Sequence, residues 1–122
     1  FMKQPWVATS SDGTDGHPRK YASFPRKYAH YVQQREALTL PEFVHHSTLL
    51  PAQVLGLSDR GRIANGAVAN VVVIDPERYR DAASYLDWHQ LTPGVEWLFI
   101  AGEPVIAKGR YNGALIGRNL LL

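Results

Sequence analysis

The 122-residue chain has no cysteine, no long apolar run and no strong excess of either charge. Without cysteine there is neither a disulfide framework nor a thiolate metal site within these residues. No apolar stretch approaches the roughly 20 residues of a membrane-spanning helix, so we expect no membrane partner. The 13 basic and 11 acidic residues leave a formal charge of +2, which is too small to indicate a nucleic-acid partner.

The length suits one domain with its own core, but a complete (β/α)8 barrel takes about 250 residues. The chain opens on Phe1 and Met2 and passes almost directly into an apolar run, which is unusual for a natural N-terminus. We therefore expect a piece of a longer polypeptide, with the remainder of that polypeptide as a partner.

One early stretch, Trp6 to Arg19, combines a short apolar run with small, polar and glycine residues. The run over 6–10 predicts a buried strand, and Asp12 and Gly13 mark the loop into which it opens. Ligands and catalytic side chains gather at the carboxyl ends of parallel strands in α/β proteins. A carboxylate there is well placed to act as a general base or to contact a metal, but Asp-Gly is also common in turns. The residues alone leave both interpretations open.

The next segment predicts a helix with an aromatic face. Four residues fall on one helical stripe after Ser23, a plausible N-cap: Phe24, Tyr28, Tyr31 and Val32. Basic residues lie between these aromatics and would also suit a nucleic-acid surface. The helical spacing favours core packing, so we expect no nucleic-acid partner.

A capping box, Thr39-Leu40-Pro41-Glu42, predicts the start of a second helix. A shorter helix over about 50–55 is expected to end at Gly56. His45 and His46 are adjacent, and neighbouring side chains on a helix diverge. Since no third ligand is near them in the sequence, a surface position is favoured over a metal site.

The second half of the chain has the composition of β-structure. Asn65-Gly66 signals a turn, and the β-branched run over 71–74 predicts a strand covered on both faces. Runs over 95–100 and 105–108 predict a hairpin. The segment 77–88 is ambiguous, with a partial helical register. The tail ends in three leucines, which need cover from another part of the protein.

Several motifs together resemble a known family. They are Ser11-Asp12-Gly13, His17-Pro18-Arg19, Phe24-Pro25-Arg26, the run over 61–76, and Gly117-Arg118. They resemble the C-terminal part of the N-acyl-D-amino-acid deacylases (D-aminoacylases), which belong to the metal-dependent amidohydrolase superfamily. The likeness covers nearly the whole chain. One departure is Ala69-Asn70, where the family usually has Ala-Asp before the valine run.

The resemblance implies an α/β fold that is completed by the rest of the polypeptide. Residues 1–60 would supply the last strand, the catalytic loop and helices of a (β/α)8, TIM-type barrel. Residues 61–122 would supply the C-terminal strands of a small β-sandwich. The departure at Ala69-Asn70 falls in the sandwich and casts little doubt on the chemistry.

The resemblance also implies a reaction, the hydrolysis of the amide bond of N-acyl-D-amino acids. The cofactor is zinc, which lowers the pKa of a bound water and polarises the scissile carbonyl. Asp12 is then the catalytic residue that takes the water's proton and passes it to the leaving amine, with Asp15 as the competitor for this role. The zinc ligands are expected mainly in the absent N-terminal part, and no metal ligand is assigned here. The chain alone is therefore expected to be inactive, and a cytoplasmic location is expected.

Arg19 is the candidate for binding the substrate's α-carboxylate, because a guanidinium offers a planar fork of donors. The structural alternative is a surface arginine or a loop-to-helix ion pair. His17 is a second substrate-binding candidate, which would orient either the loop or the substrate. Two rival functions remain: a non-catalytic α+β interaction module, and another amidohydrolase acting on cyclic amides. The motifs at 17–19 and 24–26 favour the deacylase.

Overall fold

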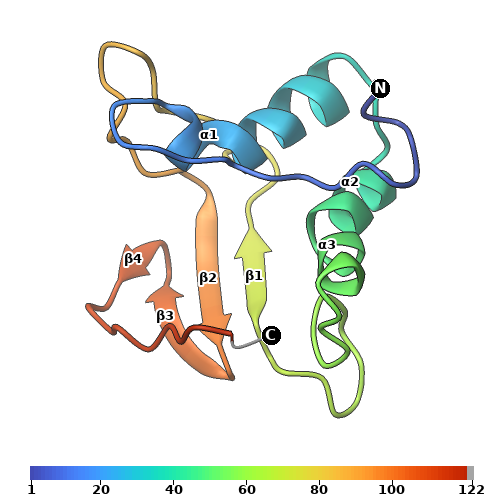
Figure 1. Cartoon of the computed structure of the whole chain (residues 1–122). Coiled ribbons are helices and arrows are strands. Elements are labelled where there is room, and N and C mark those ends of the chain that lie inside the picture. The colour runs from blue at the N-terminus through green and yellow to red at the C-terminus, as the bar shows by residue number, and fades with distance from the viewer. Residues whose placement is uncertain (121–122) are drawn as a thin grey trace.

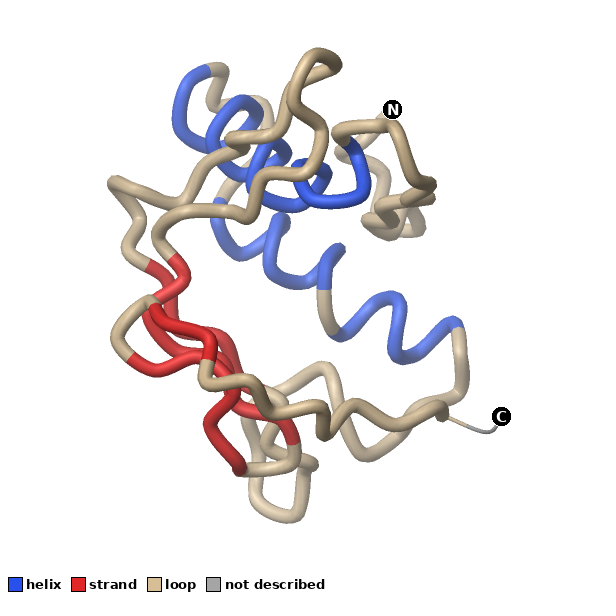
Figure 2. Tube along the Cα trace, turned by 90° about the vertical axis from the view of Figure 1, so that its left-hand side faces the viewer, coloured by secondary structure: helices blue, strands red, loops and turns tan. Residues whose placement is uncertain are grey.

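The computed structural model describes residues 1–120. The helices and the strands occupy different parts of the molecule (Figures 1 and 2). The elements in chain order are α1 (Arg19–Arg26), η1 (Lys27–Gln34), α2 (Leu40–Ser47), α3 (Leu49–Val54), β1 (Val71–Ile74), β2 (Val95–Ile100), β3 (Glu103–Ala107) and β4 (Arg110–Tyr111). In Figure 1, α1 and the helix that continues it lie across one end of the sheet. No helix in residues 1–120 is both long and apolar enough to cross a membrane.

The first helix begins earlier than the sequence predicted. Pro18 takes the N-cap position, where its missing N–H costs nothing, and α1 starts at Arg19. Ser23 therefore lies inside α1, and the prediction that it caps the helix is wrong. Its hydroxyl instead donates to the carbonyl of Arg19 at 2.8 Å, the local bond that a serine inside a helix can make.

The same helix changes its geometry after Pro25. Because proline has no N–H, Pro25 cannot donate to the carbonyl of Tyr21 one turn earlier. That carbonyl accepts a hydrogen bond from the Thr92 hydroxyl at 3.1 Å. The chain then continues as the π-helix η1, and the N–H of Arg35 donates to the carbonyl of His30, five residues back, at 3.0 Å.

The structure confirms the predicted start of α2 and the predicted end of α3. The Thr39 hydroxyl accepts from the N–H of Glu42, and the Glu42 carboxylate accepts from the N–H of Thr39 at 2.7 Å. The N–H groups of Gly56 and of the residue after it donate back into the last turn of α3, which is a Schellman ending. These local sequence signals therefore fix where α2 begins and α3 ends.

The core lies mainly among the helices. Tyr28 is buried, and its ring lies 5.6 Å from the rings of both Phe43 and Tyr79, so the predicted core role of Tyr28 is confirmed. His46 is only 3% exposed, so the surface position predicted for it is wrong. The reason is a contact that the sequence does not reveal: the segment before Asp12 covers α2, and the N–H of Thr9 donates to the carbonyl of His46 at 2.8 Å.

The sheet is an antiparallel meander in the order β1-β2-β3-β4. The strands predicted at 71–74 and 95–100 are confirmed with the same bounds, and β3 begins two residues before the predicted 105. A two-residue turn at Ala101 and Gly102 joins β2 to β3, and both residues have positive φ, as a type I′ hairpin requires. The segment 77–88 forms turns and irregular structure.

Two predictions about strands and burial are wrong for this structure. Val72 and Val73 of β1 are exposed, because the described residues do not cover both faces of the strand. The strand predicted over 6–10 is not formed, and Trp6 is 70% exposed. A barrel strand needs neighbouring strands, and no strand of residues 1–120 pairs with this segment. Thr9 fixes it to the helices instead, and its hydroxyl oxygen accepts from the Lys27 ammonium at 2.7 Å.

Candidate functional site

Asp12 and Arg19, the predicted base and the predicted carboxylate-binding residue, lie together at the start of α1. Nη2 of Arg19 is 3.2 Å from Oδ2 of Asp12. Asp12 lies in an irregular loop with φ of 44°, a left-handed conformation that aspartate adopts more readily than most residues. Arg19 is the first residue of α1. The structure therefore brings the two residues together as a loop-to-helix ion pair.

The guanidinium of Arg19 is not saturated by this pair. Its Nε is buried and has no hydrogen-bond partner among the residues that the structure describes. An unpaired buried donor costs free energy, so an added acceptor is favourable there. A carboxylate takes two parallel hydrogen bonds from a guanidinium. The guanidinium of Arg19 thus keeps one donor that Asp12 does not satisfy.

His17 is attached to the same turn of helix. Its Nδ1 accepts from the N–H of Arg19 at 3.1 Å, so the proton of the neutral imidazole resides on Nε2. That nitrogen lies 3.3 Å from the Tyr85 hydroxyl oxygen, and the two rings meet edge to face at 5.1 Å. Both ring nitrogens are therefore engaged within the protein. This geometry supports an orienting role for His17 more than direct substrate binding.

No sequence motif points to a role for Tyr85, because its contact with His17 spans 68 residues of chain. The only local signal was an aromatic residue in the ambiguous segment 77–88.

Asp15, the competitor for the role of base, has a different environment. Its carboxylate pairs with the Lys20 ammonium, and this hydrogen bond and the lysine's charge lower the pKa of Asp15. A carboxylate with a lowered pKa is a weaker base. Each of the two carboxylates is thus paired with one cation, Asp12 with Arg19 and Asp15 with Lys20.

Gly13 sets the distance between the Asp12 loop and the helix. A Cβ at this position would lie 2.9 Å from the Cα of Lys20, closer than such contacts occur. Only glycine permits this approach of the loop to α1, and the approach places Asp12 beside Arg19.

The chain matches the model of the Amidohydrolase family over residues 2–105. This chain belongs to the amidohydrolase family.

Curated relatives include deacylases of N-acyl-D-amino acids and a dihydroorotase. An N-acyl-D-glutamate deacylase of Alcaligenes xylosoxydans xylosoxydans is 41% identical over 103 residues, covering 79% of this chain and 21% of the relative. A D-aminoacylase of the same organism is 31% identical over 115 residues, covering 88% and 24%. A dihydroorotase of Bacillus caldolyticus is 35% identical over 98 residues, covering 72% and 22%. The chain therefore spans about a fifth to a quarter of the length of these relatives.

Solved structures of deacylases also match this chain. A structure of a D-aminoacylase with a binuclear metal centre matches 80% of this chain with a TM-score of 0.76 and 30% identity, over 21% of its own length. A zinc complex of N-acyl-D-glutamate deacylase from Bordetella bronchiseptica, with a phosphonate that mimics the tetrahedral intermediate, matches 78% with a TM-score of 0.71 and 35% identity, over 21% of its own length. The resemblance to the deacylases is confirmed.

The described part of this amidohydrolase chain does not form a metal site by itself. Residues 1–120 contain no group of three or more histidine, aspartate, glutamate or cysteine side chains placed to hold an ion. Asp12 is a single exposed carboxylate, and a zinc site needs three or four ligands. A metal at this loop would therefore need ligands from outside the chain.

A polar cluster under the Asp12 loop fixes the segment that precedes it. The Thr9 hydroxyl contacts both Lys27 and Ser47, and His46 is buried beside them with its Nδ1 unpaired among the described residues. Burial lowers the pKa of Lys27. Burial, and then the charges of Lys27 and His45, lower the pKa of His46. The cluster thus links the loop to η1 and α2.

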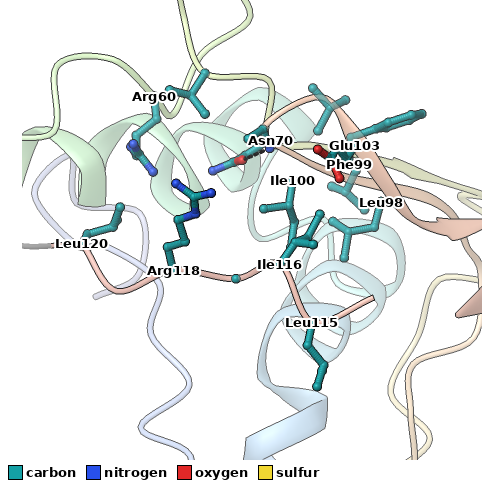
Figure 3. A pocket seen from close by; sticks show the side chains of 15 residues that line it. Arg60, Asn70, Leu98, Phe99, Ile100, Glu103, Leu115, Ile116, Arg118 and Leu120 are labelled. Carbon is teal, nitrogen blue, oxygen red and sulfur yellow. Dashed lines mark hydrogen bonds between the residues drawn. The ribbon is translucent and has the colours of Figure 1, made fainter. Parts of the chain in front are cut away.

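A groove of about 790 Å³ lies elsewhere, over the sheet and beneath the C-terminal tail (Figure 3). Its lining is largely apolar and includes Phe99 and Ile116, with Arg60, Arg118 and Asn70 toward one end. No residue of the Asp12 loop or of α1 lines it. The groove is therefore separate from the Asp12–Arg19 pair.

Proposed function

We propose that this chain is the C-terminal part of a metal-dependent hydrolase that cleaves the amide bond of N-acyl-D-amino acids. The observation that carries the proposal is the contact between Asp12 and Arg19 at 3.2 Å, which joins a candidate base to a candidate carboxylate-binding group. The relatives named as an N-acyl-D-glutamate deacylase and a D-aminoacylase support it. The chain alone is inactive in this proposal, since it supplies at most one metal ligand.

The fold proposed for the whole protein assigns the two halves to different domains. Residues 1–60 belong to the last strand and helices of a (β/α)8 barrel, and residues 61–122 belong to a small β-sandwich. Two features support this assignment. Trp6, at the start of the expected barrel strand, is exposed, and no strand within residues 1–120 lies beside it in a sheet. Val72 and Val73 of β1 are exposed on a sheet that would gain cover from a second sheet.

Asp12 is the general base and then the general acid in this proposal. Its carboxylate takes a proton from the attacking water as the new C–O bond forms. It returns that proton to the leaving amine as the C–N bond breaks. A zinc ion would supply polarisation of the scissile carbonyl, with its ligands in the rest of the polypeptide.

Arg19 binds the α-carboxylate of the substrate. Asp12 and the substrate carboxylate are alternative anionic partners of the same guanidinium, and an exposed ion pair is weak enough to exchange. When the substrate binds Arg19, the Asp12 carboxylate is released to accept a proton. The ion pair of the free protein is therefore compatible with both roles.

The test uses the full-length protein and pairs of N-acetyl-D- and N-acetyl-L-amino acids, with metal analysis of the same preparation. We expect hydrolysis of the D-isomers and bound zinc. Hydrolysis of the L-isomers alone, or turnover of neither, would contradict the proposal.

A second candidate is hydrolysis of a cyclic amide, which the 35% identity to a dihydroorotase favours. The deacylase is preferred because the N-acyl-D-glutamate deacylase is 41% identical. Turnover of dihydroorotate but not of N-acetyl-D-amino acids by the same preparation would reverse this order.

A further inference from the structure

The segment 81–92 reaches from the sheet to α1 and is fixed there at several points. In Figure 1 it is part of the connection between β1 and β2, which passes alongside α1 before β2 begins. Near its beginning, Asp81 accepts a hydrogen bond from Arg26 at 3.0 Å. At its end, Thr92 donates to the carbonyl of Tyr21, the one that Pro25 leaves without its usual donor. The segment is thus attached to both ends of α1.

Aromatic stacking adds a third attachment between these two. The His89 ring stacks on Tyr21 with centroids 5.0 Å apart, and Trp88 stacks on His89 at 5.3 Å. The Lys20 ammonium lies 6.0 Å from the centre of the Trp88 ring. These contacts hold the segment 81–92 against Lys20 and Tyr21, in the first turn of α1.

Tyr85 is the residue of this segment that reaches the candidate site. Its hydroxyl oxygen lies 3.3 Å from Nε2 of His17, and Nδ1 of His17 accepts from the N–H of Arg19. Tyr85 is 76% exposed, so its phenol ring is not part of the core. The Tyr85 hydroxyl therefore contributes to the structure mainly through its contact with His17.

We propose that Tyr85 is a positioning residue, which acts through His17 to fix Arg19 for the substrate's α-carboxylate. The inference rests on the proposed function, because it assigns Arg19 the carboxylate. The Nδ1 of His17 accepts from the N–H of Arg19, one of the donors that a helix start leaves free. The Tyr85 hydroxyl holds the other nitrogen of the ring and so fixes the ring's orientation. Without it, the imidazole turns more freely and the first turn of α1 is less well defined.

The experiment compares Tyr85→Phe with Tyr111→Phe in the full-length protein. The control also loses one phenolic hydrogen bond, from Tyr111 to the carbonyl of Ala114 at 2.9 Å, in the tail after β4. Each variant is assayed with an N-acetyl-D-amino acid and with its α-carboxamide analogue. For Tyr85→Phe we expect kcat/KM on the carboxylate to fall about three- to tenfold, mainly through KM, as for the loss of one hydrogen bond. The carboxamide should be unaffected, and Tyr111→Phe should change neither value.

Variants of His17 separate positioning from a general loss of structure. His17→Asn keeps a side-chain acceptor for the N–H of Arg19, so it should retain more carboxylate selectivity than His17→Ala. Adding Tyr85→Phe to His17→Ala should cause no further loss, because both changes remove the same connection. Amide hydrogen exchange of Arg19 should be faster in Tyr85→Phe, a readout that does not need turnover.

The outcomes distinguish the two proposals. The positioning role alone would be overturned if the wild type were active and Tyr85→Phe kept full selectivity, or lost activity equally on both substrates. A full-length wild type that hydrolyses no N-acyl-D-amino acid would overturn the proposed function, and the positioning role with it.

Discussion

Replacing Arg19 by lysine tests whether its guanidinium binds substrate or only Asp12. The variant keeps the charge and removes the planar fork. The Arg19–Asp12 pair is a single contact between side chains that are 40% and 82% exposed. Pairs of this kind contribute about 0–1 kcal/mol. The free energy of unfolding should therefore change by less than about 1 kcal/mol.

The expected effect on activity is much larger. A hydrogen bond to a charged group is worth about 1.5–3 kcal/mol, and lysine cannot reproduce both bonds of the fork. Loss of one such bond to the α-carboxylate lowers kcat/KM by roughly ten- to a hundredfold. The effect should be confined to substrates that carry this carboxylate.

The assay measures kcat/KM of the full-length wild type and Arg19→Lys on an N-acetyl-D-amino acid and its α-carboxamide, together with urea unfolding. An equal loss on both substrates, or a loss of stability well beyond 1 kcal/mol, would show that Arg19 has a structural role. Unchanged activity on both would refute the assignment of the carboxylate to Arg19.

Three further predictions concern the loop and its support. Gly13→Ala places a Cβ 2.9 Å from the Cα of Lys20, so the Asp12 loop must move and kcat/KM should fall. Gly117→Ala, with nothing within 4 Å of its Cβ, should leave kcat/KM unchanged, and equal values for the two variants would contradict the close approach. Burial lowers the pKa of His46 from 6.5, so the unfolded chain binds the proton more readily and stability should fall as pH drops below about 6.5. Urea unfolding of the full-length protein against pH checks this, and an undiminished fall in His46→Gln would contradict it. Thr39→Ala removes the capping box and should lower the free energy of unfolding by about 1 kcal/mol, whereas no change would show that α2 does not depend on its cap.

Local signals in the sequence predicted much of the fold. The capping box at 39–42 and the helix end at Gly56 depend on neighbouring residues, and the structure confirms them. The strands at 71–74 and 95–100 also form as predicted, because each finds its partner in the other. The strand expected over 6–10 depends on partners far away in the sequence. Without a paired strand among residues 1–120, its apolar pattern did not suffice to form it.

The candidate site, too, was predicted only in part, because its residues are visible in the sequence and their contacts are not. Asp12 and Arg19 are seven residues apart, and the sequence indicated both. Their contact, and the link from His17 to Tyr85, depend on how the loop turns back onto α1 and on a segment 68 residues away. The burial of His46 was missed for the same reason, because it is covered by the chain around Thr9. These contacts and this burial therefore depend on packing between distant segments, which the periodicity of a single segment does not reveal.

Asp12 is the proton-transferring group in the N-acyl-D-amino-acid hydrolase that we propose. The most direct measurement is kcat of Asp12→Asn and of Asp15→Asn in the full-length protein. Asparagine has nearly the shape of aspartate and cannot accept the proton at neutral pH, so kcat of Asp12→Asn should fall by about 10²–10⁴-fold with folding retained. Asp15→Asn should lose much less, because Asp15 lies further into the loop and is paired with Lys20, not with the carboxylate-binding candidate Arg19. Near-normal turnover by Asp12→Asn would contradict the account, and a large loss in Asp15→Asn alone would assign the role to the other carboxylate.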